Sequence, residues 1–112
     1  MKKVLILSGS PRKGGNSDVL CDEFAKGALS VGANVEKIRI SEKRIAPCTG
    51  CYFCKNSGGR CALNDDMGEV LEKILAADTL VLSSPVYFYS VSAQMKTGID
   101  RCVSRWTEIS NK

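Results

Sequence analysis

The sequence predicts an α/β fold in which helices cover a parallel sheet. Two short apolar runs, Val4 to Leu7 and Thr79 to Leu82, suit buried strands, and each ends at a turn that contains Ser and Pro. Between and after these runs, apolar residues recur at helical spacing. Strands that alternate with helices imply a parallel sheet with right-handed crossovers.

Three helices and one further strand complete the expected elements. The first helix follows a glycine-rich turn, with Asn16 or Ser17 as its cap and Gly32 at its end. The partial polar alternation from Asn34 to Ile40 is typical of an edge strand, and the third helix begins near Ser92. The expected apolar helix faces comprise Leu20, Phe24, Ala28 and Val31, then Met67, Val70, Leu71, Ile74 and Leu75, and finally Met95, Ile99, Cys102, Val103 and Trp106.

The polar second strand distinguishes between two strand orders. A flavodoxin-like doubly wound sheet, of order 2-1-3-4-5, places this strand at the edge, whereas the Rossmann order would bury it. We therefore predict one flavodoxin-like domain over residues 1–112. Five strands with their helices need roughly 150 residues, so the domain is expected to be truncated after the third helix, with the third strand as an unpaired edge. Either the sequence is a fragment or another chain completes the sheet, and we expect a homo-oligomer.

Composition excludes several classes of function. The net charge is +4 and the basic residues are dispersed, which disfavours nucleic-acid binding. No apolar run approaches the roughly 20 residues that span a bilayer, and the run after Lys3 is too short for a signal peptide, so a cytoplasmic protein without membrane contact is expected. The chain has no histidine, which excludes Ser–His–Asp hydrolysis, Cys–His catalysis and histidine-ligated metals.

The loop from Ser8 to Ser17 is a candidate anion site. Successive amides, the start of a helix and hydroxyl groups can surround a phosphate, and Arg12 can add a bidentate contact. The spacing matches neither a Walker A loop, because Gly15 and Asn16 follow the second glycine, nor a Rossmann fingerprint, because Pro11 interrupts it. The sequence predicts phosphate binding, with an ordinary glycine-rich turn as the alternative.

Four of the six cysteines lie in an irregular loop, residues 45–64, inserted after the second strand. They are Cys48, Cys51, Cys54 and Cys61. Since nothing directs secretion, metal or redox chemistry is favoured over a disulfide framework. The spacing suits a 4Fe-4S cluster, while zinc, free thiols or a redox disulfide stay open. Cys54 and Arg60 have the spacing of a thiol-phosphatase loop but lack its flanking strand and helix.

Four segments, in order along nearly the whole chain, form a further pattern. They are Gly9-Ser10-Pro11-Arg12 with Gly15-Asn16-Ser17; Pro47-Cys48 with Gly50-Cys51, Cys54, Cys61 and Asp65-Asp66-Met67; Ser84-Pro85-Val86-Tyr87; and Lys96 with Ile99-Asp100-Arg101. Together they resemble the NAD(P)H-dependent FMN reductases and their iron-sulfur flavoprotein relatives. The resemblance implies a flavoprotein that takes electrons from NAD(P)H.

The resemblance also implies roles for individual residues. The FMN phosphate would be held by Ser10, Arg12, Asn16 and Ser17. The isoalloxazine would be bordered by Pro85, Val86, Tyr87 and Phe88. These two loops follow the first and third strands, at the topological switch point where this fold binds ligands. The alternative role of Tyr87, Phe88 and Tyr89 is core or interface packing.

The implied reaction is hydride transfer from NAD(P)H to FMN, followed by electron delivery to a flavin, a quinone, another small molecule or a redox protein. A 4Fe-4S cluster at the four cysteines would divide the electron pair into single-electron steps. Two alternatives are a non-enzymatic electron carrier and an inactive fragment. Among the acidic residues, Asp65 and Asp66 are expected to serve the start of the second helix, and Asp100 to form a structural or interface pair with Arg101.

Overall fold

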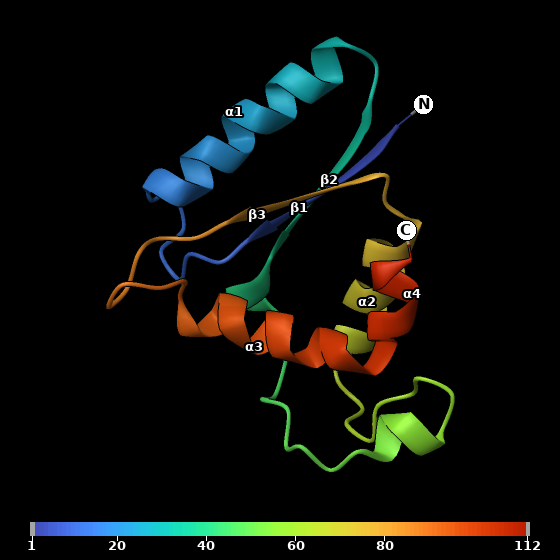
Figure 1. Cartoon of the computed structure of the whole chain (residues 1–112). Coiled ribbons are helices and arrows are strands. Elements are labelled where there is room, and N and C mark those ends of the chain that lie inside the picture. The colour runs from blue at the N-terminus through green and yellow to red at the C-terminus, as the bar shows by residue number, and fades with distance from the viewer. Residues whose placement is uncertain (1, 112) are drawn as a thin grey trace.

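The computed structural model describes residues 2–111, which form a three-stranded sheet between two layers of helices (Figure 1). The strands are β1 (Lys3–Ser8), β2 (Asn34–Arg39) and β3 (Thr79–Ser83). The helices are α1 (Asn16–Ser30), α2 (Met67–Ala76), α3 (Ala93–Arg101) and α4 (Trp106–Ser110), with 3-10 turns η1 (Ile40–Glu42), η2 (Phe53–Asn56) and η3 (Cys102–Arg105). Helix α1 covers one face of the sheet, and α2, α3 and α4 lie on the other (Figure 1).

All strand pairs are parallel, and the strand order is β2-β1-β3. In the register, Val4 of β1 lies opposite Val35 of β2 and Thr79 of β3. This order reproduces the first three strands of the predicted flavodoxin-like order, so the expectation that the second strand lies at the edge is confirmed. The carboxyl ends of β1 and β3 consequently meet at the same edge of the sheet.

The central strand β1 supplies both halves of the core, because its side chains alternate between the two faces. Val4 and Ile6 pack with Cys21 beneath α1. Leu5 and Leu7 face the other layer, where they join the buried side of α2. That side consists of Met67, Val70, Leu71 and Ile74. The predicted face of the second helix is therefore confirmed, except that Leu75 is only partly buried.

The predicted buried face of the first helix is wrong for Leu20, Phe24 and Val31, and only Ala28 of that face packs against the core. Leu20 and Val31 are 66% and 83% exposed, while Asp18 and Cys21 are buried. Besides Ala28, the side that contacts the sheet carries Cys21 and Ala25. Asp18 explains why α1 is rotated relative to this prediction. Its carboxylate pairs with Lys37 and Arg39 of β2, and these contacts turn the Asp18 face of the helix toward the sheet. The cap is also different, because Gly15 caps α1 and neither Asn16 nor Ser17 does so with its side chain.

The predicted third helix begins as expected, with Ser92 as the cap of α3, but it is not continuous. It tightens into η3 after Arg101, and α4 then turns to a new direction (Figure 1). In η3 the Ser104 hydroxyl donates a hydrogen bond to the Arg101 carbonyl at 3.3 Å, a type of bond that bends helices. No helix among residues 2–111 combines the length and apolarity needed to cross a bilayer.

Strand β3 is an open edge, because none of residues 2–111 pairs with its side away from β1. Leu80 and Leu82 are therefore 42% and 48% exposed, and the expectation of a fully buried third strand is wrong. They line a groove of about 650 Å³ together with Met95, Ile99 and Trp106. The unpaired apolar edge expected from the sequence is thus present in this part of the chain.

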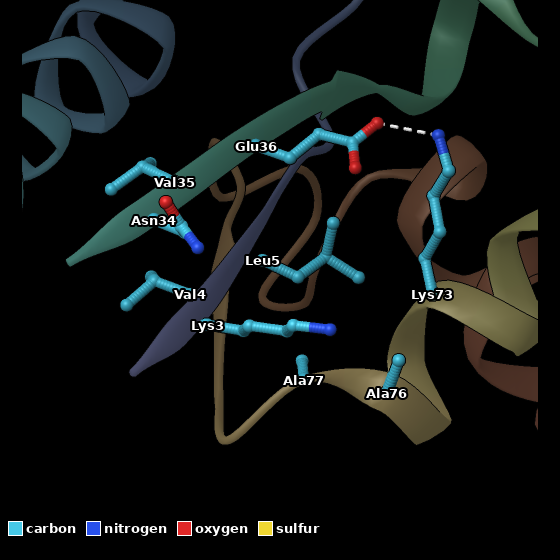
Figure 2. A pocket seen from close by; sticks show the side chains of 9 residues that line it. All are labelled: Lys3, Val4, Leu5, Asn34, Val35, Glu36, Lys73, Ala76 and Ala77. Carbon is cyan, nitrogen blue, oxygen red and sulfur yellow. Dashed lines mark hydrogen bonds and ion pairs between the residues drawn. The ribbon is translucent and has the colours of Figure 1, made fainter. Parts of the chain in front are cut away.

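A second hollow, of about 380 Å³, lies at the amino ends of β1 and β2, beside the last turn of α2 (Figure 2). Figure 2 shows Glu36 of β2 reaching across it toward Lys73 of α2, with which it forms an ion pair. Lys73 also pairs with Glu69 on its own helix. The hollow lies at the opposite end of the strands from the predicted loops, and its ion pair links the edge strand to α2.

The fully buried Ile6 gives a direct test of this core. Truncation to Ala should lower the free energy of unfolding by about 2–5 kcal/mol, because it removes packed methyl groups and leaves a cavity. The matched variant Leu80→Ala removes a half-exposed side chain and should cost about 1 kcal/mol or less. Urea denaturation measures both, and equal losses would contradict the described packing.

Candidate functional site

The two predicted loops lie side by side at the carboxyl ends of β1 and β3. The Gly9 amide donates a hydrogen bond to the Ser83 carbonyl at 2.7 Å. The Ser83 hydroxyl donates to the carbonyl of Ser17, in the first turn of α1, at 3.1 Å. Residues 66 positions apart in the sequence are therefore directly bonded. The structure thus brings together the two groups of residues that the sequence singled out.

The first loop forms a compact turn before α1. The Ser10 hydroxyl accepts a hydrogen bond from the Arg12 amide at 3.1 Å and lies 3.2 Å from the Arg12 carbonyl, so it shapes the loop. Gly14 has a φ of +78°, which favours glycine. A Cβ on Gly15 would lie 3.3 Å from the Arg12 carbonyl oxygen. The tight turn leads directly into the first residues of α1.

This loop has the features of an anion site. The first amides of a helix have no carbonyl partner within the helix, and the helix dipole adds a partial positive charge there. The side chains of Arg12 and Asn16 are exposed beside these amides, and Ser17 is half-buried. Amides, a guanidinium and hydroxyls at a helix start are the donors that phosphate prefers in proteins.

Asp18 is a site residue that sequence reasoning missed. Its buried carboxylate accepts hydrogen bonds from the Gly14 amide at 3.0 Å and the Ser8 hydroxyl at 3.1 Å. It also pairs with Lys37 at 2.7 Å and with the Arg39 Nε at 3.5 Å. The Lys37 ammonium, followed by the Gly14 amide, lowers the Asp18 pKa to about 2. Asp18 therefore stays ionised and ties the glycine-rich loop to β2.

A sequence signal for this arrangement existed. Lys37 and Arg39 are two residues apart on an edge strand, so their side chains project from the same face. That face is covered by α1, and two cations there require a buried acid. The Arg39 guanidinium also donates to the Ser10 carbonyl at 3.1 Å, which fixes the loop from a second side.

The second loop, after β3, ends in a tight turn that presents aromatic side chains. Tyr87 and Ser90 exchange two backbone hydrogen bonds, at 2.9 and 3.2 Å. Phe88 and Tyr89 at the tip have φ values of +48° and +67°, and both side chains are 94% exposed. Of the remaining predicted residues, Pro85 is half-buried and Val86 is exposed. Left-handed backbone at two aromatic residues is costly, and such strain is concentrated at binding sites.

Ser92 joins both loops to the start of α3. Its hydroxyl donates to the Gly9 carbonyl at 2.6 Å and accepts from the Met95 amide at 3.2 Å. Its amide donates to the Ser84 hydroxyl at 2.8 Å. A Cβ on Gly9 would lie only 2.9 Å from the Met95 Cβ, so this approach requires glycine. Helix α3 therefore holds the two loops in a fixed relation.

The cysteine loop forms a separate candidate site. The four predicted ligands, Cys48, Cys51, Cys54 and Cys61, line one cavity of about 130 Å³ beside Arg101. All four are free thiols. A hydrogen bond from the Phe53 amide, followed by one from Thr49, lowers the pKa of Cys51. Among residues 2–111, no three Cys, Asp or Glu side chains are grouped closely enough to hold a metal ion.

An ion pair with little exposed side-chain surface lies beside this cavity, and Arg101 is the partner that lines it. Arg101 and Asp65 form two hydrogen bonds, Nη1 to Oδ2 at 2.8 Å and Nη2 to Oδ1 at 3.0 Å. Asp65 also accepts from the amides of Ala46 at 2.9 Å and Met67 at 3.1 Å, so it serves the start of α2 as expected. The expected pair of Asp100 with Arg101 is wrong, because Asp100 pairs with Lys96. Arg101 lowers the Asp65 pKa to about 2.

The order β2-β1-β3 and the joined loops at its carboxyl edge define a flavodoxin-like α/β protein. The sequence model of one family, NADPH-dependent FMN reductase, matches residues 2–112. The chain belongs to this family, as its sequence motifs indicated.

Individual relatives agree with this assignment. An iron-sulfur flavoprotein of Archaeoglobus fulgidus is 48% identical over 101 residues, which are 90% of this chain and 45% of the relative. An iron-sulfur flavoprotein of Methanocaldococcus jannaschii is 43% identical over 99 residues, which are 88% of this chain and 51% of the relative. The fold alone is also that of the solved NAD(P)H:quinone oxidoreductase of Methanothermobacter marburgensis, which superposes with a TM-score of 0.73 at 24% identity over 89% of this chain and 52% of that chain. The chain thus spans about half the length of the curated relatives it matches.

The buried carboxylate of Asp18 generates a pH-dependent prediction. Because its folded pKa of about 2 lies below the ordinary 3.8, its ionised form stabilises the fold above about pH 4. This contribution is lost as the pH falls toward 2. We expect Asp18→Asn to unfold at lower urea concentration than the wild type at pH 7, with the difference disappearing near pH 2. A difference that persists unchanged at pH 2 would contradict the assignment.

Proposed function

We propose that this chain binds FMN across its two joined loops and passes electrons from NAD(P)H to a small acceptor such as a flavin or a quinone. One observation carries the proposal: a loop with the donors of a phosphate site and an aromatic loop are bonded together at the carboxyl edge of the sheet. Ligands of this fold class bind at that edge, and the chain belongs to a family of FMN reductases.

The phosphate is assigned to the first loop. Arg12 would add a charged, bidentate contact, Asn16 and Ser17 would add side-chain donors, and the first amides of α1 would complete the shell. Ser10 would act by holding the turn, given its bonds to Arg12. The negative charge of Asp18 is neutralised by Lys37 and Arg39, so it does not repel an anion in this loop.

The isoalloxazine is assigned to the second loop. Pro85, Val86, Tyr87 and Phe88 follow β3 directly, and the exposed side chains there provide an apolar border. A flat, largely apolar ring is recognised by such surfaces together with a few backbone donors. When bound, FMN would supply the chemistry, because its ring accepts a hydride, two electrons and one proton in all, from NAD(P)H. The chain itself would orient the ring.

We further assign Cys48, Cys51, Cys54 and Cys61 to a 4Fe-4S cluster. The four thiols line one cavity, and four cysteine sulfurs are the donor set that iron-sulfur clusters require. Two relatives at 43% and 48% identity are named iron-sulfur flavoproteins. The loop would have to close around the group, since its free thiols are not grouped for a metal ion.

The proposed setting is the cytoplasm, with the chain working as a homo-oligomer. Every cysteine among residues 2–111 is a free thiol, which suits a reducing compartment. The open edge of β3 and the groove beside it expose apolar residues that association would cover.

The phosphate assignment predicts a difference between two flavins. The wild-type chain should bind FMN more tightly than riboflavin, which has the same ring without the phosphate. Arg12→Ala should weaken FMN binding by at least about tenfold, because it removes a charged, bidentate contact to the phosphate, and leave riboflavin binding unchanged. Quenching of flavin fluorescence measures all four affinities.

Lys26→Ala is the matched control, since Lys26 lies on α1, away from the loop that holds Arg12, and pairs with Glu23. If Arg12→Ala weakened the binding of FMN and of riboflavin equally, the assignment of Arg12 to the phosphate would be contradicted. With FMN bound, the wild-type chain should oxidise NAD(P)H in the presence of a quinone. FMN binding without turnover would refute the oxidoreductase activity but not the flavin site.

The cluster assignment predicts a chromophore. Anaerobic incubation with ferrous iron and sulfide should give the broad visible absorption of a 4Fe-4S cluster with about four iron atoms per chain. Cys51→Ser should abolish it, whereas Cys102→Ala should retain it, because Cys102 lies outside the cysteine cavity and burial raises its pKa. If the protein is colourless and contains zinc when it is purified, the four cysteines would instead be assigned to a zinc site.

A further inference from the structure

The Ser10 carbonyl is an acceptor inside the loop that is assigned to the FMN phosphate. Pro11 follows it, so the peptide bond between these two residues carries a carbonyl oxygen but no N–H. A carbonyl oxygen that faces an anion repels it, whereas the neighbouring amides attract it. The loop can therefore hold a phosphate only while the Ser10 carbonyl points out of the site.

Two side chains outside the loop donate hydrogen bonds to this carbonyl. The Nη2 of Arg39, at the end of β2, donates at 3.1 Å, and the hydroxyl of Ser41, in η1, donates at 3.4 Å. The first distance is that of an ordinary N–H···O bond, whereas the second is long for a hydroxyl donor. Because Ser10 is only 4% exposed, water has little access to its carbonyl, and Arg39 is the main donor.

The Arg39 side chain is held from several sides. It is 10% exposed, its Nη1 pairs with Glu42, and its Nε lies 3.5 Å from the Asp18 carboxylate. This Nε has no hydrogen-bond partner among residues 2–111, whereas the Lys37 ammonium approaches Asp18 to 2.7 Å. Lys37 is therefore the closer cation of Asp18, and the bond to the Ser10 carbonyl is what distinguishes Arg39 from Lys37.

We propose that Arg39 is a positioning residue for the FMN phosphate, because it holds the Ser10 carbonyl toward β2 and leaves the amides of the loop to face the anion. This inference rests on the flavin site described under the proposed function. The Arg39 guanidinium bonds the carbonyl and Glu42 through separate nitrogens of one planar group, which a lysine ammonium cannot reproduce. Since the isoalloxazine is assigned to the other loop, the effect should be confined to flavins that carry the phosphate.

The test compares two variants of the full chain that lose the same charge. Arg39→Met removes the guanidinium and its bond to the Ser10 carbonyl but keeps an unbranched apolar side chain. Lys37→Met is the matched comparison, because Lys37 lies two residues earlier on the same face of β2 and pairs with Asp18 and Asp22 of α1. Each variant leaves Asp18 with one of these two cations. Quenching of flavin fluorescence gives the affinity of each protein for FMN and for riboflavin.

We expect Arg39→Met to bind FMN about tenfold more weakly than the wild type, the effect of losing one hydrogen bond from a charged donor, and to bind riboflavin unchanged. Lys37→Met should lose clearly less affinity for FMN. A purely structural role of Arg39 would weaken the binding of both flavins. The proposal would be overturned by an unchanged FMN affinity in Arg39→Met, by an equal loss of FMN and riboflavin affinity in that variant, or by an equal loss of FMN affinity in both variants.

A second measurement needs no variant. In the FMN-bound wild-type chain, labelled with 15N-arginine, nuclear magnetic resonance should show that the guanidinium protons of Arg39 exchange slowly with water, because they stay buried and bonded to the Ser10 carbonyl. Rapid exchange at Arg39 in this complex would overturn the proposal and leave the flavin site intact. Wild-type protein that fails to bind FMN would instead refute the proposed flavin site and the role of Arg39 in it.

Discussion

The main chain at Gly9 is the point on which the candidate flavin site depends. Its amide bonds to the end of β3 and its carbonyl to the Ser92 hydroxyl at the start of α3, so three elements meet at one residue. The close approach of Met95 leaves no room there for a side chain. Because both loops diverge from this junction, their relative position is set by the main chain of Gly9, bonded to the end of β3 and to the short, buried side chain of Ser92.

Two buried acids perform equivalent tasks in the two candidate sites. Asp18 ties the glycine-rich loop to the cations of β2, and Asp65 ties the start of α2 to Arg101 beside the cysteines. Each carboxylate accepts backbone amides as well as charged side chains, which keeps it ionised inside the protein. In both cases the acid fixes a loop that has little regular structure, so ionic contacts replace secondary structure as the source of order.

The open side of β3 relates the fold to the length of its relatives. The groove beside Leu80 and Leu82 is apolar, and Trp106 at its border is 60% exposed. Relatives that match this chain are about twice as long. The glycine-rich loop, the aromatic loop and the cysteine cavity nevertheless all lie within the described residues. The candidate flavin loops and the cysteine loop thus both lie in the part of the family pattern that this chain covers.

The sequence by itself determined the strand order, the edge position of β2, the glycine-rich turn and the cysteine spacing, because each depends on local composition and periodicity. It did not reveal the buried side of α1, the break after Arg101 or the roles of Asp18 and Arg101. These depend on contacts between residues far apart in the chain, such as Asp18 with Lys37 and Asp65 with Arg101. Only the tertiary structure decided them, since a charge is buried where a distant partner compensates it, and periodicity carries no information about that partner.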